Sequence, residues 1–265
     1  MRNRWWWLAV ALVLLLALVL RVQKIRHISL TNDEVAEVTW SSMLFGDMMD
    51  QIALDMVHPP LDYILQHVIG LTNPPDWVRR IAPVSFGVAT VGLIIALGTL
   101  WCGRLAGLLG GLFLAIAPLH VRFSQEIRPY SMAMFFMTGS ILALELYARR
   151  RRIAWGVAWF AGVYLAALTF YFAGMVAGVV SVARIYIARR DELAHVWRRL
   201  PLLFVGWAAL YAFWIPTAMV WAAFVLVVIG SDVRARAEEA VLARAFGAAY
   251  TDYCARTKRF IPGVY

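Results

Sequence analysis

The chain has 265 residues, of which 62% are hydrophobic and only 15% are charged. Soluble domains are about half apolar and about a quarter charged, so this composition excludes an ordinary water-soluble domain. The formal net charge of +9 could suggest a nucleic-acid-binding protein. However, the basic residues lie in short segments between apolar runs, which is typical of an oriented membrane protein. We therefore expect no nucleic-acid partner.

The apolar residues occur in blocks of roughly 18–20 residues, the length that crosses the hydrocarbon core of a bilayer. The pattern predicts an all-α integral membrane protein of about eight transmembrane helices. The predicted spans are 5–21, 81–101, 104–120, 130–148, 153–170, 171–188, 200–215 and 217–230. No small-residue cleavage site follows the first run, so we expect it to be a retained helix and not a cleaved signal peptide.

One long polar segment, residues 22–80, separates the first two apolar runs, and we expect short amphipathic helices in it. If the N-terminus is cytoplasmic, 18 of the 25 Lys and Arg residues lie on the cytoplasmic side, including the run 149–152. This bias follows the positive-inside rule. We therefore predict a cytoplasmic N-terminus and a periplasmic or extracellular 22–80 loop.

The first motif of this loop begins at Thr31. Thr31 and Glu34 form a capping-box pattern, which predicts the start of a helix. Asp33 and Glu37 are then four residues apart on one helix face, where like charges repel. This favours a positive group or a proton between them, and a carboxylate beside a membrane-embedded cavity can act as a general base. The alternative is that Glu34 only caps the helix and Asp33 only faces solvent.

The second motif is His58-Pro59-Pro60-Leu61-Asp62-Tyr63. Pro59 and Pro60 end one element and are suited to the first turn of the next. His58 is therefore expected at a rigid corner near the membrane surface. A single histidine in such a place is either a structural hydrogen-bond partner or part of a site, and its sequence context leaves both interpretations open.

The third motif covers residues 122–130, on the same predicted outer side. Pro129 suits the first turn of the following helix, and Arg128 before it is displaced from helical geometry. Arg122 and Arg128 oppose the inside-positive bias, and two arginines there suit the capture of a phosphate or pyrophosphate. The alternative is interfacial anchoring of both side chains. Acids, a rigid corner and arginines on one side together suit group transfer from a phosphorylated lipid carrier.

Over residues 5–216, the chain resembles the bacterial GT-C glycosyltransferases of the protein-mannosyltransferase and aminoarabinose-transferase type. The resemblance rests on an ordered set of segments, which is more specific than any one of them. These are Asp33-Glu34, His58-Pro59-Pro60-Leu61, residues 76–83, residues 103–108, Pro118-Leu119-His120, residues 124–130, Tyr171-Phe172 and Trp214-Ile215-Pro216.

This resemblance implies inverting transfer of a sugar from a polyprenyl-phosphate donor to an acceptor at the outer face of a bacterial inner membrane. Asp33 matches the acceptor-activating carboxylate, and Glu34 matches its neighbour. The implied donor-binding residues are Glu37, His58, Arg122, Gln125, Glu126, Arg128 and Tyr130, with Arg128 on phosphate. The expected partners are membrane lipid and the lipid-linked sugar. Such enzymes differ in metal dependence, and we predict neither a metal site nor a cofactor.

The chain departs from the family in length, because GT-C members are usually about twice as long. We therefore expect residues 1–216 to form a truncated GT-C-like module. Residues 217–265 are expected to form a last transmembrane helix and a cytoplasmic amphipathic tail.

The tail resembles isoprenylcysteine carboxyl methyltransferase-like membrane proteins. The similar segments are residues 234–239, 246–250, Tyr253 and residues 259–262. In that family the tandem acids, here Glu238 and Glu239, lie near the S-adenosylmethionine pocket. Three functions therefore stay open: a glycosyltransferase, an S-adenosylmethionine-dependent membrane methyltransferase, and a non-catalytic membrane remnant. The tail also suits a basic helix on the inner membrane surface.

Overall fold

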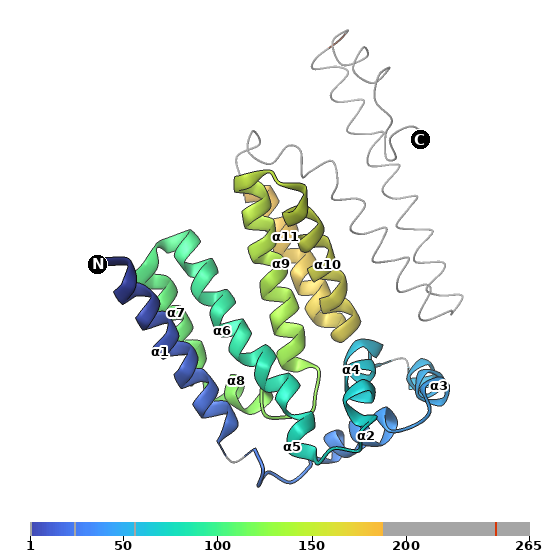
Figure 1. Cartoon of the computed structure of the whole chain (residues 1–265). Coiled ribbons are helices and arrows are strands. Elements are labelled where there is room, and N and C mark those ends of the chain that lie inside the picture. Colours follow the sequence, from blue (N-terminus) through green and yellow to red (C-terminus); the bar gives the residue numbers. More distant parts are fainter. Residues whose placement is uncertain (1, 24, 56, 188–246, 248–265) are drawn as a thin grey trace. The chain divides into compact units, whose positions relative to one another are not determined.

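The computed structural model describes residues 2–23, 25–55, 57–187 and 247. The chain divides into two units, residues 1–184 and 185–265. Every regular element in the described ranges is an α-helix (Figure 1). The helices are α1 (Arg2–Val22), α2 (Asn32–Ser41), α3 (Phe45–Asp55), α4 (Pro60–Gly70), α5 (Asp76–Arg79), α6 (Ile81–Cys102), α7 (Arg104–Ile116), α8 (Pro118–Phe123), α9 (Tyr130–Arg150), α10 (Ile153–Thr169) and α11 (Tyr171–Ile187).

Three helical stretches of the described chain are long and apolar enough to cross a membrane. They are Arg4–Val22, Asp76–Cys102 and Tyr130–Arg150. Three shorter apolar helices lie at Arg104–Ile116, Ile153–Thr169 and Tyr171–Val182. The all-helical character and the membrane character are therefore supported. The total of eight spans stays a prediction, because the runs 200–215 and 217–230 lie outside the described residues.

The expected run 104–120 is divided by a proline. α7 ends at Ile116, Ala117 is extended, and Pro118 opens the short helix α8. Proline has no amide hydrogen and disfavours the helical conformation of the residue before it, which explains the break. α8 then leads into the segment before α9, where the third motif lies.

We call these six apolar helical stretches the membrane helices, and α6, α7, α9 and α10 among them pack through small residues. A Cβ atom on Gly98 of α6 would lie 2.8 Å from the Cα atom of Gly107 in α7. A Cβ atom on Gly162 of α10 would lie 2.8 Å from the Cβ atom of Ser140 in α9. Close approach at small residues is the usual basis of helix association in membranes. Large apolar side chains such as Phe113, which is 66% exposed, stay on the outer faces, which is compatible with a membrane protein.

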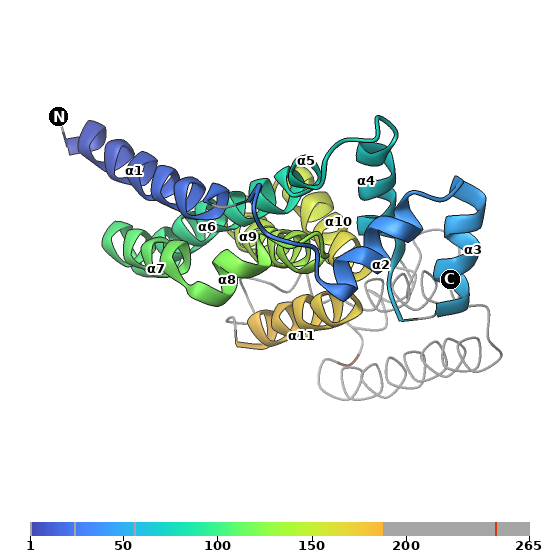
Figure 2. The ribbon, with the colours of Figure 1, turned by 90° about the horizontal axis from the view of Figure 1, so that it is seen from below.

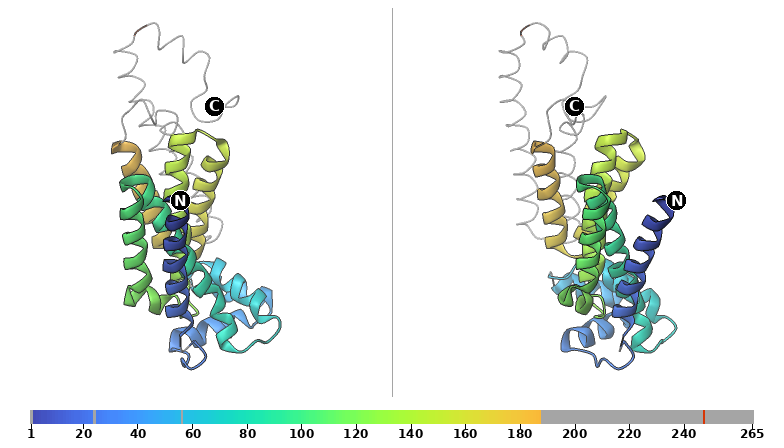
Figure 3. Two further views of the ribbon diagram at one scale, coloured as in Figure 1. Left: turned by 60° about the vertical axis from the view of Figure 1, so that its left-hand side comes forward. Right: turned by 90° about the vertical axis from the view of Figure 1, so that its left-hand side faces the viewer.

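The described part of the 22–80 segment contains short helices, as expected, and we call these four, α2 to α5, the cap helices. They lie at one end of the membrane helices, with α8 at the same end (Figures 1 and 3). Seen from below, α3 and α4 lie on the side away from α1 and α7 (Figure 2). α4 packs against both α2 and α10. The cap helices thus stand beside the beginning of α9.

Two local predictions for the cap helices are confirmed. The capping box is present: Glu34 N–H donates to Thr31 Oγ1 at 3.3 Å, and Thr31 N–H donates to Glu34 Oε2 at 2.9 Å. Pro60 opens α4 at its first turn, with Pro59 as the N-cap residue. These two helix starts determine where α2, which carries the first motif, and α4, which follows His58 of the second motif, begin.

Candidate functional site

Arg128 joins the three predicted motifs. It precedes α9, is 9% exposed, and donates from Nη1 to Glu37 Oε2 of α2 at 3.3 Å. Its Nη2 atom lies 3.4 Å from His58 Nε2, at the corner before α4. The structure therefore brings together Glu37, His58 and Arg128, which are up to 91 residues apart. We call this group, with its neighbours, the Arg128 cluster: Glu37, Asp55, His58, Asp62, Tyr63 and Arg128.

The partners of His58 define its tautomer. A guanidinium group can only donate hydrogen bonds, so His58 Nε2 accepts from Arg128. The other ring nitrogen, Nδ1, lies 2.7 Å from Asp55 Oδ2 and donates to it. Asp55 also accepts from the backbone N–H of His58 at 3.1 Å. His58 is therefore held in one orientation between a carboxylate of α3 and the guanidinium before α9.

Two buried carboxyl groups face Arg128. Glu37 is 0% exposed and Asp62 is 4% exposed. Burial, and next the charge of Asp62, raise the pKa of Glu37 well above its usual range, although Arg128 and a hydrogen bond from Tyr63 act in the opposite direction. Burial also raises the pKa of Asp62 to about 7, against the lowering effect of Arg128. Between about pH 5 and 7, Asp62 therefore retains a proton that an ordinary aspartate would have released.

Three polar atoms of the cluster are buried without a hydrogen-bond partner among the described residues. They are Glu37 Oε1, Asp62 Oδ2 and Arg128 Nε. Buried polar groups are normally paired, so three unpaired atoms on three segments need an explanation. They offer both donor and acceptor capacity to a bound polar group.

Aromatic rings enclose the cluster on the side of α2 and α4. The Trp40 ring is stacked on Tyr63, with ring centroids 5.6 Å apart, and meets the His58 ring edge-on at 6.5 Å. Arg128 lies over the ring of Tyr130, 5.7 Å from its centroid. These rings lower the local dielectric and so strengthen the charge interactions among Glu37, Asp62 and Arg128. Tyr130, predicted as a donor-site residue, is thus in contact with Arg128.

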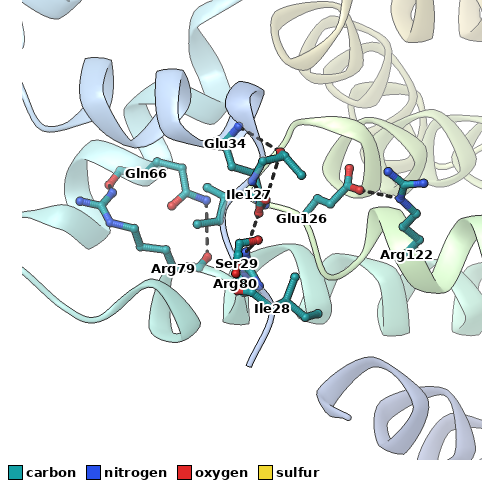
Figure 4. A network of polar contacts seen from close by, with 10 residues as sticks. Ile28, Ser29, Glu34, Gln66, Arg79, Arg80, Arg122, Glu126 and Ile127 are labelled. Carbon is teal, nitrogen blue, oxygen red and sulfur yellow. Dashed lines mark hydrogen bonds and ion pairs between the residues drawn. The ribbon is translucent and has the colours of Figure 1, made fainter. Parts of the chain in front are cut away.

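Glu34 is engaged by the protein itself (Figure 4). Its Oε1 atom accepts from Arg80 Nη2 at 3.0 Å and from the backbone N–H of Ile127 at 2.9 Å, while Oε2 serves the capping box. Glu34 and Arg80 are both 0% exposed. Asp33, in contrast, is exposed in the first turn of α2 and makes no ion pair with any described residue. The two acids of the Asp-Glu motif therefore have different surroundings.

The rest of the third motif has separate partners. Arg122 is 70% exposed and pairs with Glu126 at 2.9 Å (Figure 4). Gln125 Nε2 donates to the carbonyl oxygens of Leu20, Arg21 and Gln23 at the end of α1, at 3.0–3.3 Å. Arg122 and Arg128 are thus bound to different acids instead of forming one paired clamp. Gln125 links the segment to α1.

Sequence reasoning missed Asp62, Tyr63 and Asp55 as members of the site. The available signal was the position of Asp62 four residues after His58, in the first turn that Pro60 opens. It also missed that basic residues on the predicted outer side are mostly buried hydrogen-bond donors. Of these, four are at most 9% exposed: Arg21, Arg79, Arg80 and Arg128.

Arg21 is the most completely bonded of these arginines. Nε donates to Ser124 Oγ at 3.2 Å, and Nη1 donates to the carbonyl oxygens of Ala17 and Ala115 at 2.8 and 3.2 Å. Nη2 donates to the Leu114 carbonyl oxygen at 3.4 Å and to His120 Nδ1. The five N–H groups thus meet five acceptors, two of which are carbonyl oxygens at the end of α7, where a cation is favourable.

The remaining predictions concern other parts of the chain or other ligands. Glu238 and Glu239, the alternative methyltransferase site, lie outside the described residues. Within the described ranges, no group of three or more His, Cys, Asp or Glu side chains is arranged to hold a metal ion. Comparison with protein-family models, with curated proteins and with solved structures gives no match to this chain.

Proposed function

We propose that the chain is a GT-C-type glycosyltransferase module, which moves a sugar from a polyprenyl-phosphate donor to an acceptor at the cap-helix end of the membrane helices. The observation that carries this proposal is the Arg128 cluster. A buried guanidinium with an unpaired Nε atom stands at the beginning of a membrane helix, between a buried acid and an oriented histidine. Guanidinium groups bind phosphate well, and Arg128 directly precedes α9, one of the three described helical stretches long and apolar enough to cross a membrane.

The two acids of the Asp-Glu motif receive different roles. Asp33 is exposed and so can reach an acceptor, which makes it the proposed general base. Glu34 has both oxygens engaged by Thr31, Arg80 and Ile127, so its proposed role is to position α2. Glu37, one turn after Asp33, orients Arg128. This division gives each acid of α2 a distinct test.

The proposed reaction is a single displacement. The acceptor oxygen or nitrogen forms a bond to the anomeric carbon of the sugar, while the bond from that carbon to the phosphate oxygen breaks. The electron pair of the broken bond goes to the phosphate, which leaves as polyprenyl phosphate, and the acceptor proton goes to Asp33. Arg128 stabilises the charge that develops on the leaving phosphate.

The proposal is tested by transfer from short-chain polyprenyl-phosphate sugars, with a panel of hexoses and pentoses and the purified full chain. Asp33→Asn is expected to lower the rate by at least about 100-fold, the usual contribution of a general base. Arg128→Ala is expected to raise the donor KM. Asp47→Asn removes an exposed acid in the first turn of α3 and is the matched control, with unchanged transfer expected. Absence of wild-type transfer from every donor, or transfer that does not depend on Asp33, would overturn the proposal.

A further inference from the structure

The Arg128 cluster holds more acid than base. Two buried carboxyl groups, Glu37 and Asp62, face one guanidinium. If both were ionised, the cluster would carry an excess negative charge in a buried setting, and a phosphate group would add another. Burial of unpaired charge is costly, and acids in such places take up protons instead. The composition of the cluster therefore connects phosphate binding with protonation.

We propose that the Arg128 cluster binds the donor phosphate together with a proton, which is taken up by the Glu37–Asp62 pair. This inference rests on the function proposed above. A proton on Glu37 weakens its hold on Arg128 Nη1, so that Nη1 and the unpaired Nε can both donate to the phosphate. The unpaired oxygens Glu37 Oε1 and Asp62 Oδ2 are available to hold and share the proton.

The neighbouring elements bring no other unpaired charge to the pair among the described residues. Asp55 of α3 is bound to His58. Arg79 of α5 is directed at Gln66 and at Ser41 and Ser42. α10, which packs against α4, contains no Asp, Glu, His, Lys or Arg in residues 153–169. Among the described residues, the titratable and charged groups that act directly on the pair are thus Tyr63 and Arg128. His58 and Tyr130 contact Arg128, and Asp55 contacts His58, so these three act on the pair through its neighbours.

The direction of the pH effect follows from charge. Burial already raises the pKa of Asp62 to about 7 and that of Glu37 well above its usual range. A phosphate on Arg128 adds negative charge and removes part of the stabilisation by Arg128, so it raises both pKa values further. Above about pH 7 the empty site has released a proton that the occupied site retains. Affinity then falls as pH rises, by up to about tenfold per pH unit for one proton.

The test uses farnesyl methyl phosphate, a phosphodiester that carries one negative charge throughout the pH range. Its binding to the purified full chain is measured by calorimetry from pH 6 to 9, in two buffers of different ionisation enthalpy. The wild type is expected to bind most tightly at pH 6, to lose affinity above about pH 7, and to take up close to one proton at pH 8. Asp62→Asn replaces the acid by a neutral amide of similar shape, so it should bind at pH 8.5 nearly as tightly as the wild type at pH 6.

Two further variants keep the test decisive. Glu37→Gln should flatten the pH dependence in the same way, which covers the case in which Asp62→Asn does not fold. Asp47→Asn, an exposed acid outside the cluster, should keep the wild-type slope. Binding that depends on Arg128 but shows no proton uptake would overturn the proton coupling and leave the donor site in place. Absence of binding by the wild type at every pH would overturn the donor site and the coupling together.

Discussion

Replacement of Glu34 by Gln isolates the charge of one buried side chain. Glutamine is accepted at this position of a capping box, so the start of α2 is retained. The exchange keeps the shape of the side chain but removes the negative charge that lies 3.0 Å from Arg80. Arg80 is 0% exposed, and its other acceptors are the carbonyl oxygens of Ile28 and Ser29. The variant therefore leaves a buried guanidinium without its counter-ion.

The expected loss is about 3–5 kcal/mol, the usual result of removing one partner of a buried ion pair. Loss of the cap alone would cost about 1 kcal/mol, so the two explanations differ by more than the error of the measurement. Arg80→Met removes the other charge. In the double variant the buried charge is absent, so its loss should be smaller than the sum of the two single losses by about 2 kcal/mol.

The free energy of unfolding is measured in mixed detergent micelles by titration with a denaturing detergent. The wild type, the two single variants and the double variant are compared at one pH. A Glu34→Gln variant within about 1 kcal/mol of the wild type, or strictly additive losses, would refute the conclusion that the buried Glu34–Arg80 pair stabilises the fold through its charges.

The remaining predictions use the same unfolding assay. Gly87→Ala should cost about 1–3 kcal/mol, because its Cβ would lie 2.7 Å from Ser124 Cβ and 3.1 Å from Arg21 Nε. Gly92→Ala, which would meet only Leu14 at 3.8 Å, is the control, and equal losses would contradict the packing argument. Arg21→Lys should cost about 1–3 kcal/mol, since three donors replace five; wild-type stability would show that the carbonyl contacts contribute little. Raising the pH from 5 to 8 should lower stability, because folded Asp62, with its pKa raised from 3.8 to about 7, keeps a proton that the unfolded chain has released. An equal decrease in Asp62→Asn would argue against this origin.

Local signals in the sequence predicted the helix starts well. Thr31 and Glu34 are three residues apart, and Pro60 acts on its own helix, so their effects depend on neighbours in the chain. The break at Pro118 had an equally local signal, which the long apolar run 104–120 concealed. A prediction from hydropathy alone therefore gave one span where the structure has two helices, α7 and α8.

The partners of the buried arginines could not be predicted in this way. Arg80 and Glu34 are 46 residues apart, and Arg21 and Ser124 are 103 apart. Their pairing depends on how the membrane helices pack, which no spacing in the sequence encodes. The same holds for Asp62: its position beside His58 was readable, but its burial against Glu37 depends on the packing of α4 on α2.

The long separations also set an order for assembly during synthesis. α1 leaves the ribosome with Arg21 near its end, but the Leu114, Ala115 and Ser124 acceptors of that guanidinium follow about one hundred residues later. Likewise, Glu34 can accept from the Ile127 amide, and Glu37 from Arg128, only after residues 127 and 128 have been synthesised. Until residues 114–124 have been synthesised, the Ala17 carbonyl is the one acceptor of Arg21 described above that is already present, so its other N–H groups need water or lipid headgroups as temporary partners. We therefore expect the contacts of the segment between α8 and α9 to form last. A nascent chain that stops before this segment should present its first helix and its cap helices as separate, protease-sensitive pieces.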